Sequence, residues 1–202
     1  MYNAAAIFEA SIGEARNLTA LFDFLTANVK TPFPYDDLLR SQIVYSVSAF
    51  DKLMHDIVRI GMVSCYAGTR APTDRYLAEP VSLQIHSSLV GATIPPKEFI
   101  FEQEIVTKLS RLSFQDPDKV TDGLSLIWKE KQKWAKIAAA MGKTADDART
   151  TLKLIVGRRN AIVHESDMNP LTNVKTTISA AETKDVTDFL QNCGTSIVGL
   201  VV

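Results

Sequence analysis

One stretch of the chain gathers side chains that could act on a phosphodiester. From Gly157 to Asp167 the sequence reads GRRNAIVHESD, so two adjacent arginines, an amide, an imidazole and two acids surround three apolar residues. Histidine titrates near neutral pH and can move a proton, whereas arginine offers a planar cationic fork that matches phosphate oxygens. In RNA the attacking group is the neighbouring 2′-hydroxyl, so neither a metal ion nor a protein nucleophile is needed. The stretch therefore predicts acid–base catalysis by His164, with Arg158 or Arg159 stabilising charge on the phosphoryl group.

Helical spacing determines which of these side chains can meet. Asn160 and His164 are four residues apart and share a helix face. Arg159 and His164 are five residues apart, which is about 140° around an ideal helix. A symmetric dimer in which two copies of the stretch face each other would supply both residues to one cleft. The alternative interpretation is structural, because arginine and histidine in a last helical turn also satisfy free carbonyls and the helix dipole.

Apolar residues at steps of three and four predict the helices that must position this stretch. The helix that ends in it begins after Thr144, with Asp146 and Asp147 near its N-terminus. The same pattern predicts further helices over residues 3–28, 36–61, 80–89, 100–112 and 117–142, and from 181 or 182 to the C-terminus. The apolar segment 197–202 is expected to be a docked end of the last helix or an oligomer contact. Since no alternating strand pattern or internal repeat occurs, we expect an all-α helical bundle, formed as a single domain over residues 1–202.

Composition is typical of a folded protein outside the membrane. Hydrophobic residues make up 46% and charged residues 22% of the chain, which is enough to fill a core and argues against disorder. The N-terminus has no basic segment of a secretory signal, and no run approaches the roughly 18 apolar residues of a membrane span. Cys65 and Cys193 are too few and too far apart for a disulfide framework or a zinc site. We expect a cytoplasmic protein with reduced thiols, no metal and no cofactor.

Positive charge is concentrated beside the stretch, although the formal net charge of the chain is only -1. Residues 129–159 contain nine lysines and arginines and three acids, a net charge of about +6 that the rest of the chain offsets. Such a segment could attract a polyanion locally. Without the stretch that follows it, the same segment would be interpreted as a solvated helix face rich in lysine.

The residues around Arg159 resemble a known family signature. Arg159-Asn160-Ala161-Ile162-Val163-His164 looks like the signature of HEPN domains, an arginine followed by a polar residue, three further residues and a histidine. The flanks resemble the RiboL-PSP-HEPN branch, from Phe114-Gln115-Asp116-Pro117 through Trp134 and Leu152 to His164-Glu165. Asp51 and His55 in the second predicted helix also resemble the pattern of that branch. The similarity covers most of the chain from about Leu38 onward.

This resemblance implies a helical bundle that forms a homodimer with the motif helices at its interface and acts as a metal-independent endoribonuclease. It also implies settings such as toxin–antitoxin systems, phage defence or RNA processing, with an antitoxin or another protein as a further partner. Carried over by position, Arg159 and His164 would be catalytic and Asn160 would position them. Arg158 remains a second candidate for the catalytic arginine or for phosphate binding.

Other roles are open for the same residues. Asp51 and His55 lie four residues apart and could bond to each other or support the motif, or they could be a capped or surface pair. A HEPN module could bind RNA or nucleotide without cutting it, because fold does not determine activity. The chain could also be a helical interaction partner in which the motif is structural. Intact Arg159 and His164 favour the ribonuclease, whereas the near-neutral net charge mildly favours the other two functions.

Overall fold

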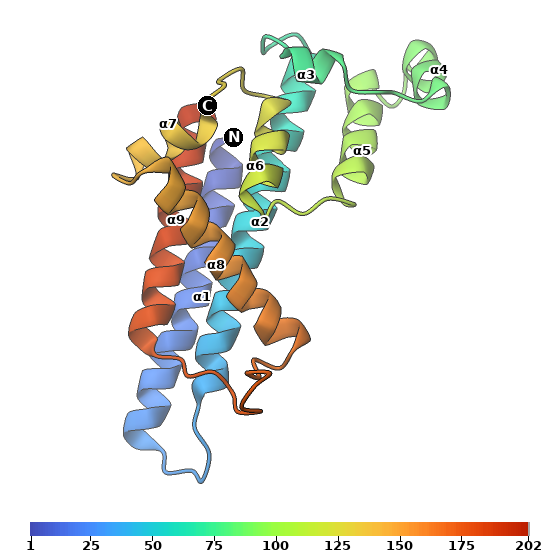
Figure 1. Ribbon diagram of the computed structural model, residues 1–202. Helices are drawn as coiled ribbons and strands as arrows, with labels where there is room; N and C mark the ends of the chain where they lie inside the picture. Colours follow the sequence, from blue (N-terminus) through green and yellow to red (C-terminus); the bar gives the residue numbers. More distant parts are fainter. Residues whose placement is uncertain (202) are drawn as a thin grey trace.

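The computed structural model describes residues 1–201 and contains nine α-helices in that range (Figure 1). An isolated bridge between Met168 and Lys175 is the only β pairing within residues 1–201, which confirms the all-α prediction. None of the helices described in this range is both long enough and apolar enough to cross a membrane. In chain order the helices are α1 (Tyr2–Asn28), α2 (Asp36–Tyr66), α3 (Asp74–Leu77), α4 (Leu83–Gly91), α5 (Lys97–Leu109), α6 (Pro117–Ser125), α7 (Lys133–Ala140), α8 (Ala145–His164) and α9 (Ala180–Val201).

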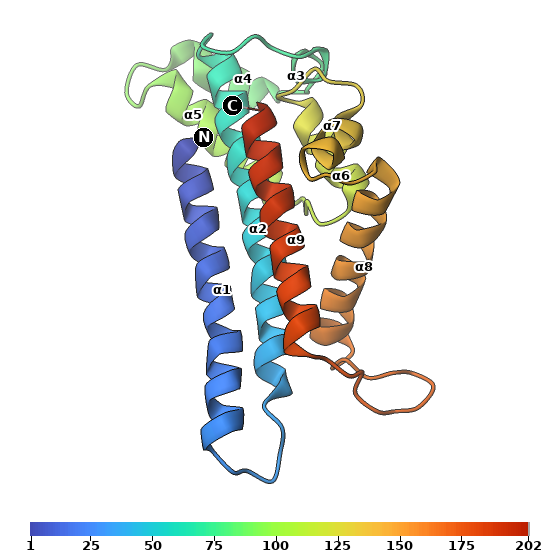
Figure 2. The same ribbon diagram turned by 90° about the vertical axis from the view of Figure 1, so that its left-hand side faces the viewer.

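Three long helices, α1, α2 and α9, run side by side and form the body of the molecule, and α8 packs obliquely against α2 (Figures 1 and 2). The short helices α3 to α7 gather toward the end of the bundle where both chain termini lie. The C-terminal end of α8 points toward the other end, near the start of α2. The predicted stretch is therefore presented at the edge of the bundle and not inside it.

Helix α2 is the central element, because it contacts α1, α5, α6, α8 and α9. Its predicted apolar stripe, which includes Phe50 and Ile57, is fully buried. The helix continues past Gly61, where the sequence pattern predicted its end, to Tyr66. A Cβ at Gly61 would lie 2.5 Å from Cγ2 of Ile127. This glycine thus provides space for a neighbouring segment and does not end the helix.

The predicted helix over residues 117–142 is wrong, because the structure has two helices there, α6 and α7, separated by residues 126–132. The indole Nε1 of Trp134 donates a hydrogen bond to the carbonyl of Pro117 at 2.9 Å. In one straight helix these residues would be about 26 Å apart. Lys133 Nζ donates to the carbonyl of Glu130 at 2.5 Å and helps to hold the turn. The apolar spacing continues through the turn, so periodicity alone could not reveal it.

The other boundaries differ by a few residues. The middle helix begins after Ser82 and not at Pro80, because the Ser82 hydroxyl accepts a hydrogen bond from the backbone N–H of Ile85 at 3.2 Å. The end of the last helix is docked in the bundle, since Ile197 and Val201 are buried. This is the first of the two predicted alternatives, a docked helix end or an oligomer contact. Val202, the final residue of the predicted apolar segment, lies outside the described residues.

Candidate functional site

Local signals determine both ends of α8, the helix that carries the predicted stretch. Thr144 caps its N-terminus by accepting a hydrogen bond from the backbone N–H of Asp147 at 3.2 Å. Ala148 and Leu152 are buried against the bundle, so the opposite side of the helix is exposed. The helix ends at His164. The predicted position of the motif at the C-terminal end of this helix is therefore confirmed.

One face of α8 is left open by the rest of the chain. Lys153, Gly157, Asn160 and His164 are all exposed and follow one another at helical spacing along this face. The imidazole of His164 forms no hydrogen bond with any residue in the described part of the chain. A Cβ placed on Gly157 would meet nothing within 4 Å. This exposed face of α8 is therefore available to a substrate or to a second copy of the protein.

Arg159 is turned toward the exposed face of α8. Its Nη1 donates a hydrogen bond to Oδ1 of Asn160 at 3.0 Å, and Asn160 shares its face with His164. The arginine is half-buried, and its Nε is buried without a hydrogen-bond partner among residues 1–201. The bond to Asn160 therefore turns the Arg159 side chain toward the face of His164, although ideal helix spacing places the two residues about 140° apart.

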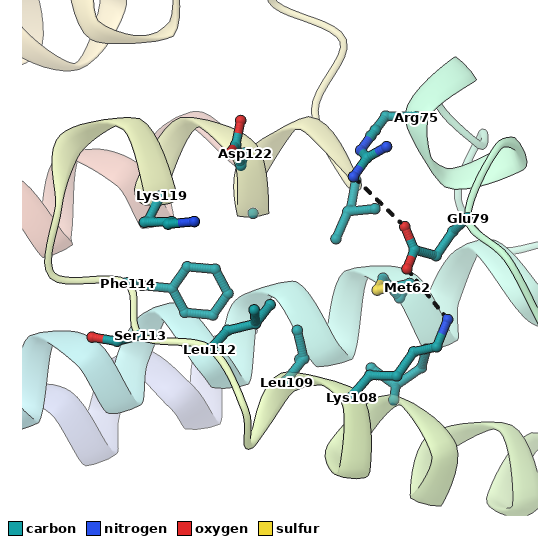
Figure 3. A pocket seen from close by; sticks show the side chains of 13 residues that line it. Met62, Arg75, Glu79, Lys108, Leu109, Leu112, Ser113, Phe114, Lys119 and Asp122 are labelled. Atoms are coloured by element: carbon teal, nitrogen blue, oxygen red, sulfur yellow. Dashed lines mark hydrogen bonds and ion pairs between the residues drawn. The ribbon is translucent and has the colours of Figure 1, made fainter.

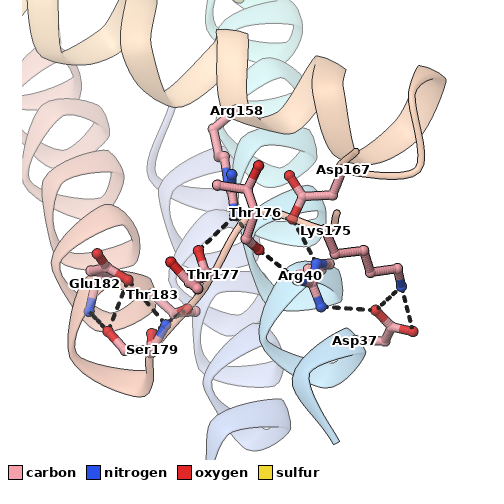
Figure 4. Close-up of polar contacts among 10 residues, drawn as sticks. All are labelled: Asp37, Arg40, Arg158, Asp167, Lys175, Thr176, Thr177, Ser179, Glu182 and Thr183. Carbon is pink, nitrogen blue, oxygen red and sulfur yellow. Dashed lines mark hydrogen bonds and ion pairs between the residues drawn. The ribbon is translucent and has the colours of Figure 1, made fainter. Parts of the chain in front are cut away.

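Arg158 is engaged elsewhere. Its Nη2 lies 2.9 Å from Oδ2 of Asp167 and donates to the carbonyl of Thr177 at 3.0 Å (Figure 4). The Asp167 side chain is only 1% exposed. Because Arg158 is held by a buried carboxylate and a backbone carbonyl, the geometry favours Arg159 over Arg158 as the candidate arginine of the site.

Arg40 and Asp167 form an ion pair to which the sequence pattern assigned no function. Arg40 Nε donates to Oδ2 of Asp167 at 2.6 Å, and both side chains are buried. Burial disfavours the charged guanidinium, but hydrogen bonds and charge interactions with Asp167 and Asp37 outweigh it, so the pKa of Arg40 is raised. One sequence signal was present. Arg40 lies in register with the apolar stripe of α2, three residues before Ile43, and a buried charge there requires a partner.

Asp51 and His55 lie at the link between α5 and α6. The Asp51 carboxylate accepts hydrogen bonds from the backbone N–H of Phe114 at 2.6 Å and from Nε2 of Gln115 at 3.2 Å. His55 packs edge-on against the Phe114 ring with centroids 4.8 Å apart. Its Nε2 is 3.8 Å from Asp51 Oδ1, too far for a hydrogen bond. No hydrogen bond within residues 1–201 joins this pair to Arg159, Asn160 or His164.

Only some of the basic side chains of residues 129–159 are exposed and without an ion pair among the described residues. Lys133 is buried, Arg149 lies 2.7 Å from Asp118, and Arg158 is paired with Asp167. Lys153 is exposed, shares the face of His164 and makes no ion pair among the described residues. Local attraction of a polyanion would therefore depend on Lys153 and on the exposed lysines of residues 129–143, which are Lys129, Lys131, Lys136 and Lys143.

A cavity of about 290 Å³ between α2, α5 and α6 is separate from the motif (Figure 3). Met62 and Phe114 contribute apolar walls, and Glu79, 3.2 Å from Lys108, lies at its edge. None of residues 157–167 lines it. Within residues 1–201, the His, Cys, Asp and Glu side chains form no group of three or more that could hold a metal ion.

Comparison with family models agrees with the fold. The model of the RiboL-PSP-HEPN family matches residues 9–202, which is almost the whole chain. No curated protein and no solved structure is significantly similar to the chain. The match covers the helices that position the Arg159-to-His164 segment, α2 and α8, along their full lengths. The chain belongs to the RiboL-PSP-HEPN family.

Proposed function

We propose that the protein is a metal-independent endoribonuclease that acts as a homodimer, with Arg159, Asn160 and His164 in its site. The observation that carries the proposal is the bond from Arg159 to Asn160, which holds a cationic fork on the exposed face of α8 that also carries His164. Membership of the HEPN families is compatible with a ribonuclease or with a nucleotide-binding module. An acid–base group beside a cation that can contact phosphate favours the ribonuclease.

The reaction is an intramolecular transesterification of the RNA phosphodiester. The 2′-oxygen attacks phosphorus, the bond from phosphorus to the 5′-oxygen breaks, and the products carry a 2′,3′-cyclic phosphate and a 5′-hydroxyl. His164 removes the proton from the 2′-hydroxyl or donates a proton to the leaving 5′-oxygen. Arg159 stabilises the negative charge that develops on the non-bridging oxygens. In a dimer, two copies of His164 could divide the base and acid roles between them.

The exposed face of α8 also supports the dimer. Leu154, one turn before Arg158, is 70% exposed, and Val163 beside His164 is 45% exposed. Gly157 leaves the helix backbone open between them, which would allow another helix to approach closely. Leu154 and Val163 are nine residues apart, about 180° around the helix, so they flank this face on opposite sides. A two-fold contact centred on Gly157 would bring two copies of the motif into one cleft.

The decisive experiment is cleavage of a single-stranded RNA in EDTA by the wild type, Arg159→Ala and His164→Ala. Each substitution should lower the rate by about 10²–10⁴-fold. A 2′-O-methyl group at the scissile nucleotide should block cleavage, because it removes the attacking hydroxyl. Arg149→Ala, on the same helix, and His86→Ala, an exposed histidine elsewhere, are matched controls that should cut at the wild-type rate.

The possible results separate the candidate functions. Cleavage that requires a divalent metal, or that survives both substitutions, would reject the proposed mechanism. Binding of RNA without cleavage would support the non-catalytic module. If neither binding nor cleavage occurs, the helical interaction partner is the better description.

We also propose, from the family resemblance, that the activity serves as a toxin, a phage-defence factor or an RNA-processing enzyme in the cytoplasm. A toxin would arrest growth of the cells that express it, and an antitoxin could be its protein partner. Induced expression should therefore slow growth for the wild type and not for His164→Ala at equal protein levels. Equal growth of the two cultures would contradict a role as a toxin and would leave the proposed reaction untested by this experiment.

A further inference from the structure

A buried carboxylate joins three parts of the chain directly behind the motif. Asp167 lies three residues after His164, and its Oδ2 accepts hydrogen bonds from Arg40 Nε at 2.6 Å and Arg158 Nη2 at 2.9 Å (Figure 4). The second oxygen, Oδ1, is buried and has no partner among residues 1–201. The side chain is therefore held in place through the two arginines.

The same arginines also hold the segment that follows the motif. Arg40 Nη2 donates to the carbonyl of Thr176 at 2.8 Å, and Arg158 Nη2 donates to that of Thr177 at 3.0 Å. The backbone N–H of Thr176 donates to the carbonyl of Asp167 at 2.9 Å. At the solvent side, Asp37 accepts hydrogen bonds from Arg40 at 3.0 Å and from Lys175 at 2.9 Å. The N-terminal part of α2, the end of α8 and residues 175–177 thus meet at Asp167.

The backbone after His164 adopts a conformation that its own residues disfavour. Ser166 has φ 53° and Asp167 has φ 59°, so two consecutive residues with a Cβ are left-handed. Each such residue costs about 1–2 kcal/mol. The N–H groups of Glu165 and Asp167 both donate to the carbonyl of Ala161, at 3.0 and 2.9 Å. The buried contacts of the Asp167 side chain add to these backbone hydrogen bonds in stabilising the ending.

The direction of the His164 side chain depends on that ending. His164 is the last residue of α8, it is exposed, and no side chain in residues 1–201 bonds to its ring. The backbone of the last helical turn therefore sets the direction in which the imidazole leaves the helix, and the Asp167 contacts stabilise that turn. We propose that Asp167, bound by Arg40 and Arg158, is a positioning residue that holds the backbone at the end of α8 and so determines where the His164 imidazole extends from the exposed face of α8.

The cost of burying these charges supports a role beyond stability. A buried ion pair recovers little free energy after desolvation, and an apolar replacement of similar volume is often as stable. Three charges gathered behind the motif are better explained by the defined geometry that they impose on the end of α8. The inference rests on the proposed function, because it takes His164 as the catalytic histidine.

The test uses histidine-selective NMR together with RNA cleavage in the full chain. The chain has three histidines, so the rings of His55 and His86 serve as internal references. In Asp167→Asn the ring and backbone signals of His164 should shift or broaden while those of the other two stay unchanged. The kcat should fall about 10- to 100-fold with KM within about twofold, as expected for a misplaced catalytic group.

Two further variants make the test specific. Arg40→Lys keeps the charge but loses the fork that joins Asp167 to Thr176, so its kcat and His164 signals should lie between those of the wild type and Asp167→Asn. It also provides the measurement if Asp167→Asn does not fold. Asp56→Asn is the matched control, because Asp56 is a buried carboxylate beside Lys52 and Arg59. This control should leave the His164 signals unchanged.

Wild-type His164 signals in folded Asp167→Asn, or in Arg40→Lys if only that variant folds, would overturn the positioning role. A loss of kcat accompanied by an equal change in the Asp56→Asn control would also overturn it. If the His164 signals move in Asp167→Asn but the wild type cuts no RNA, the positioning role stands and the proposed function fails.

Discussion

Arg159 and Asn160 bond to each other through their side chains, with Nη1 3.0 Å from Oδ1, although they are consecutive residues on a helix. An amide can accept from the guanidinium and still offer N–H donors to a phosphate oxygen. We expect Asn160→Ala to release the arginine from the exposed face of α8 and to lower kcat/KM for RNA about 10- to 100-fold. Because Asn160 is exposed, the free energy of unfolding should change by less than about 0.5 kcal/mol.

Steady-state RNA cleavage and urea unfolding would measure these two effects. Thr150→Ala, an exposed position of α8 nearer its N-terminus, is the matched control and should leave both quantities unchanged. Wild-type cleavage by Asn160→Ala would mean that the bond between the two side chains has no part in the reaction.

Asp51 is expected to act on stability and not on chemistry. Its carboxylate accepts hydrogen bonds from the backbone of Phe114 and the side chain of Gln115, which connect α2 to the start of the segment leading into α6. Asp51→Ala leaves a buried backbone N–H without its acceptor, and we expect a loss of about 1–3 kcal/mol in the free energy of unfolding. Urea unfolding checks this loss. A fall in kcat in fully folded Asp51→Ala would instead assign the residue to the site.

Gly157 offers a way to separate the fold from the dimer. Leucine is a better helix former than glycine by roughly 0.8 kcal/mol, and the position is open, so Gly157→Leu should not lower the melting temperature. A large side chain there would obstruct a second helix that approaches the exposed face of α8. We therefore expect the dimer to dissociate at concentrations where the wild type is dimeric, measured by sedimentation velocity.

The control for this substitution is Gly13→Leu, which makes the same change at an exposed glycine of α1 that also has open space around it. It should keep the wild-type dimer. An unchanged dimer in Gly157→Leu, or a wild type that is monomeric at micromolar concentration, would contradict the proposed interface.

The thiols should be unreactive in the native protein. Burial raises the pKa of Cys193 from its ordinary value near 9.0 to about 12 and also raises the pKa of Cys65. At pH 8 we expect no reaction with Ellman's reagent until urea unfolds the chain, when both thiols should react. Rapid labelling of the native protein at pH 8 would show that one of the two sites opens without unfolding.

The raised pKa of Cys193 also has a defined effect on stability. Below pH 9 the thiol is protonated in the folded and the unfolded chain, so its burial is fully compatible with folding. Between about pH 9 and 12 the unfolded chain ionises first, and stability is lost as the pH rises through this range. Cys193→Ala should show a smaller decrease in the free energy of unfolding between pH 8 and pH 10 than the wild type.

Features set by neighbouring residues could be predicted from the sequence. The start of α8 at Thr144, the burial of Ala148, Leu152 and Ile155, and the position of the motif at the C-terminal end of the helix all depend on neighbouring residues, and the structure has them where periodicity and capping predict them. The contact between Arg159 and Asn160 also joins neighbouring residues, but the sequence predicted only a positioning role for Asn160, and it did so from the family resemblance.

Features that depend on distant partners could not be predicted in this way. The turn between α6 and α7 is stabilised by the bond from Trp134 to Pro117, which forms only when the chain folds back. Arg40 and Asp167 are 127 residues apart in sequence, so neither one predicts the other. A polar residue on an apolar stripe indicates that a buried partner exists, but its identity requires the three-dimensional arrangement.

Both ends of the described chain lie at one end of the bundle, whereas the C-terminal end of α8 points toward the other (Figure 1). A fluorophore or a surface anchor attached at either end would therefore be carried away from His164. Labelled protein could be titrated with RNA by fluorescence anisotropy, and anchored protein could be exposed to RNA in flow, with the exposed face of α8 unobstructed. The orientation of the bundle makes such measurements compatible with an intact site.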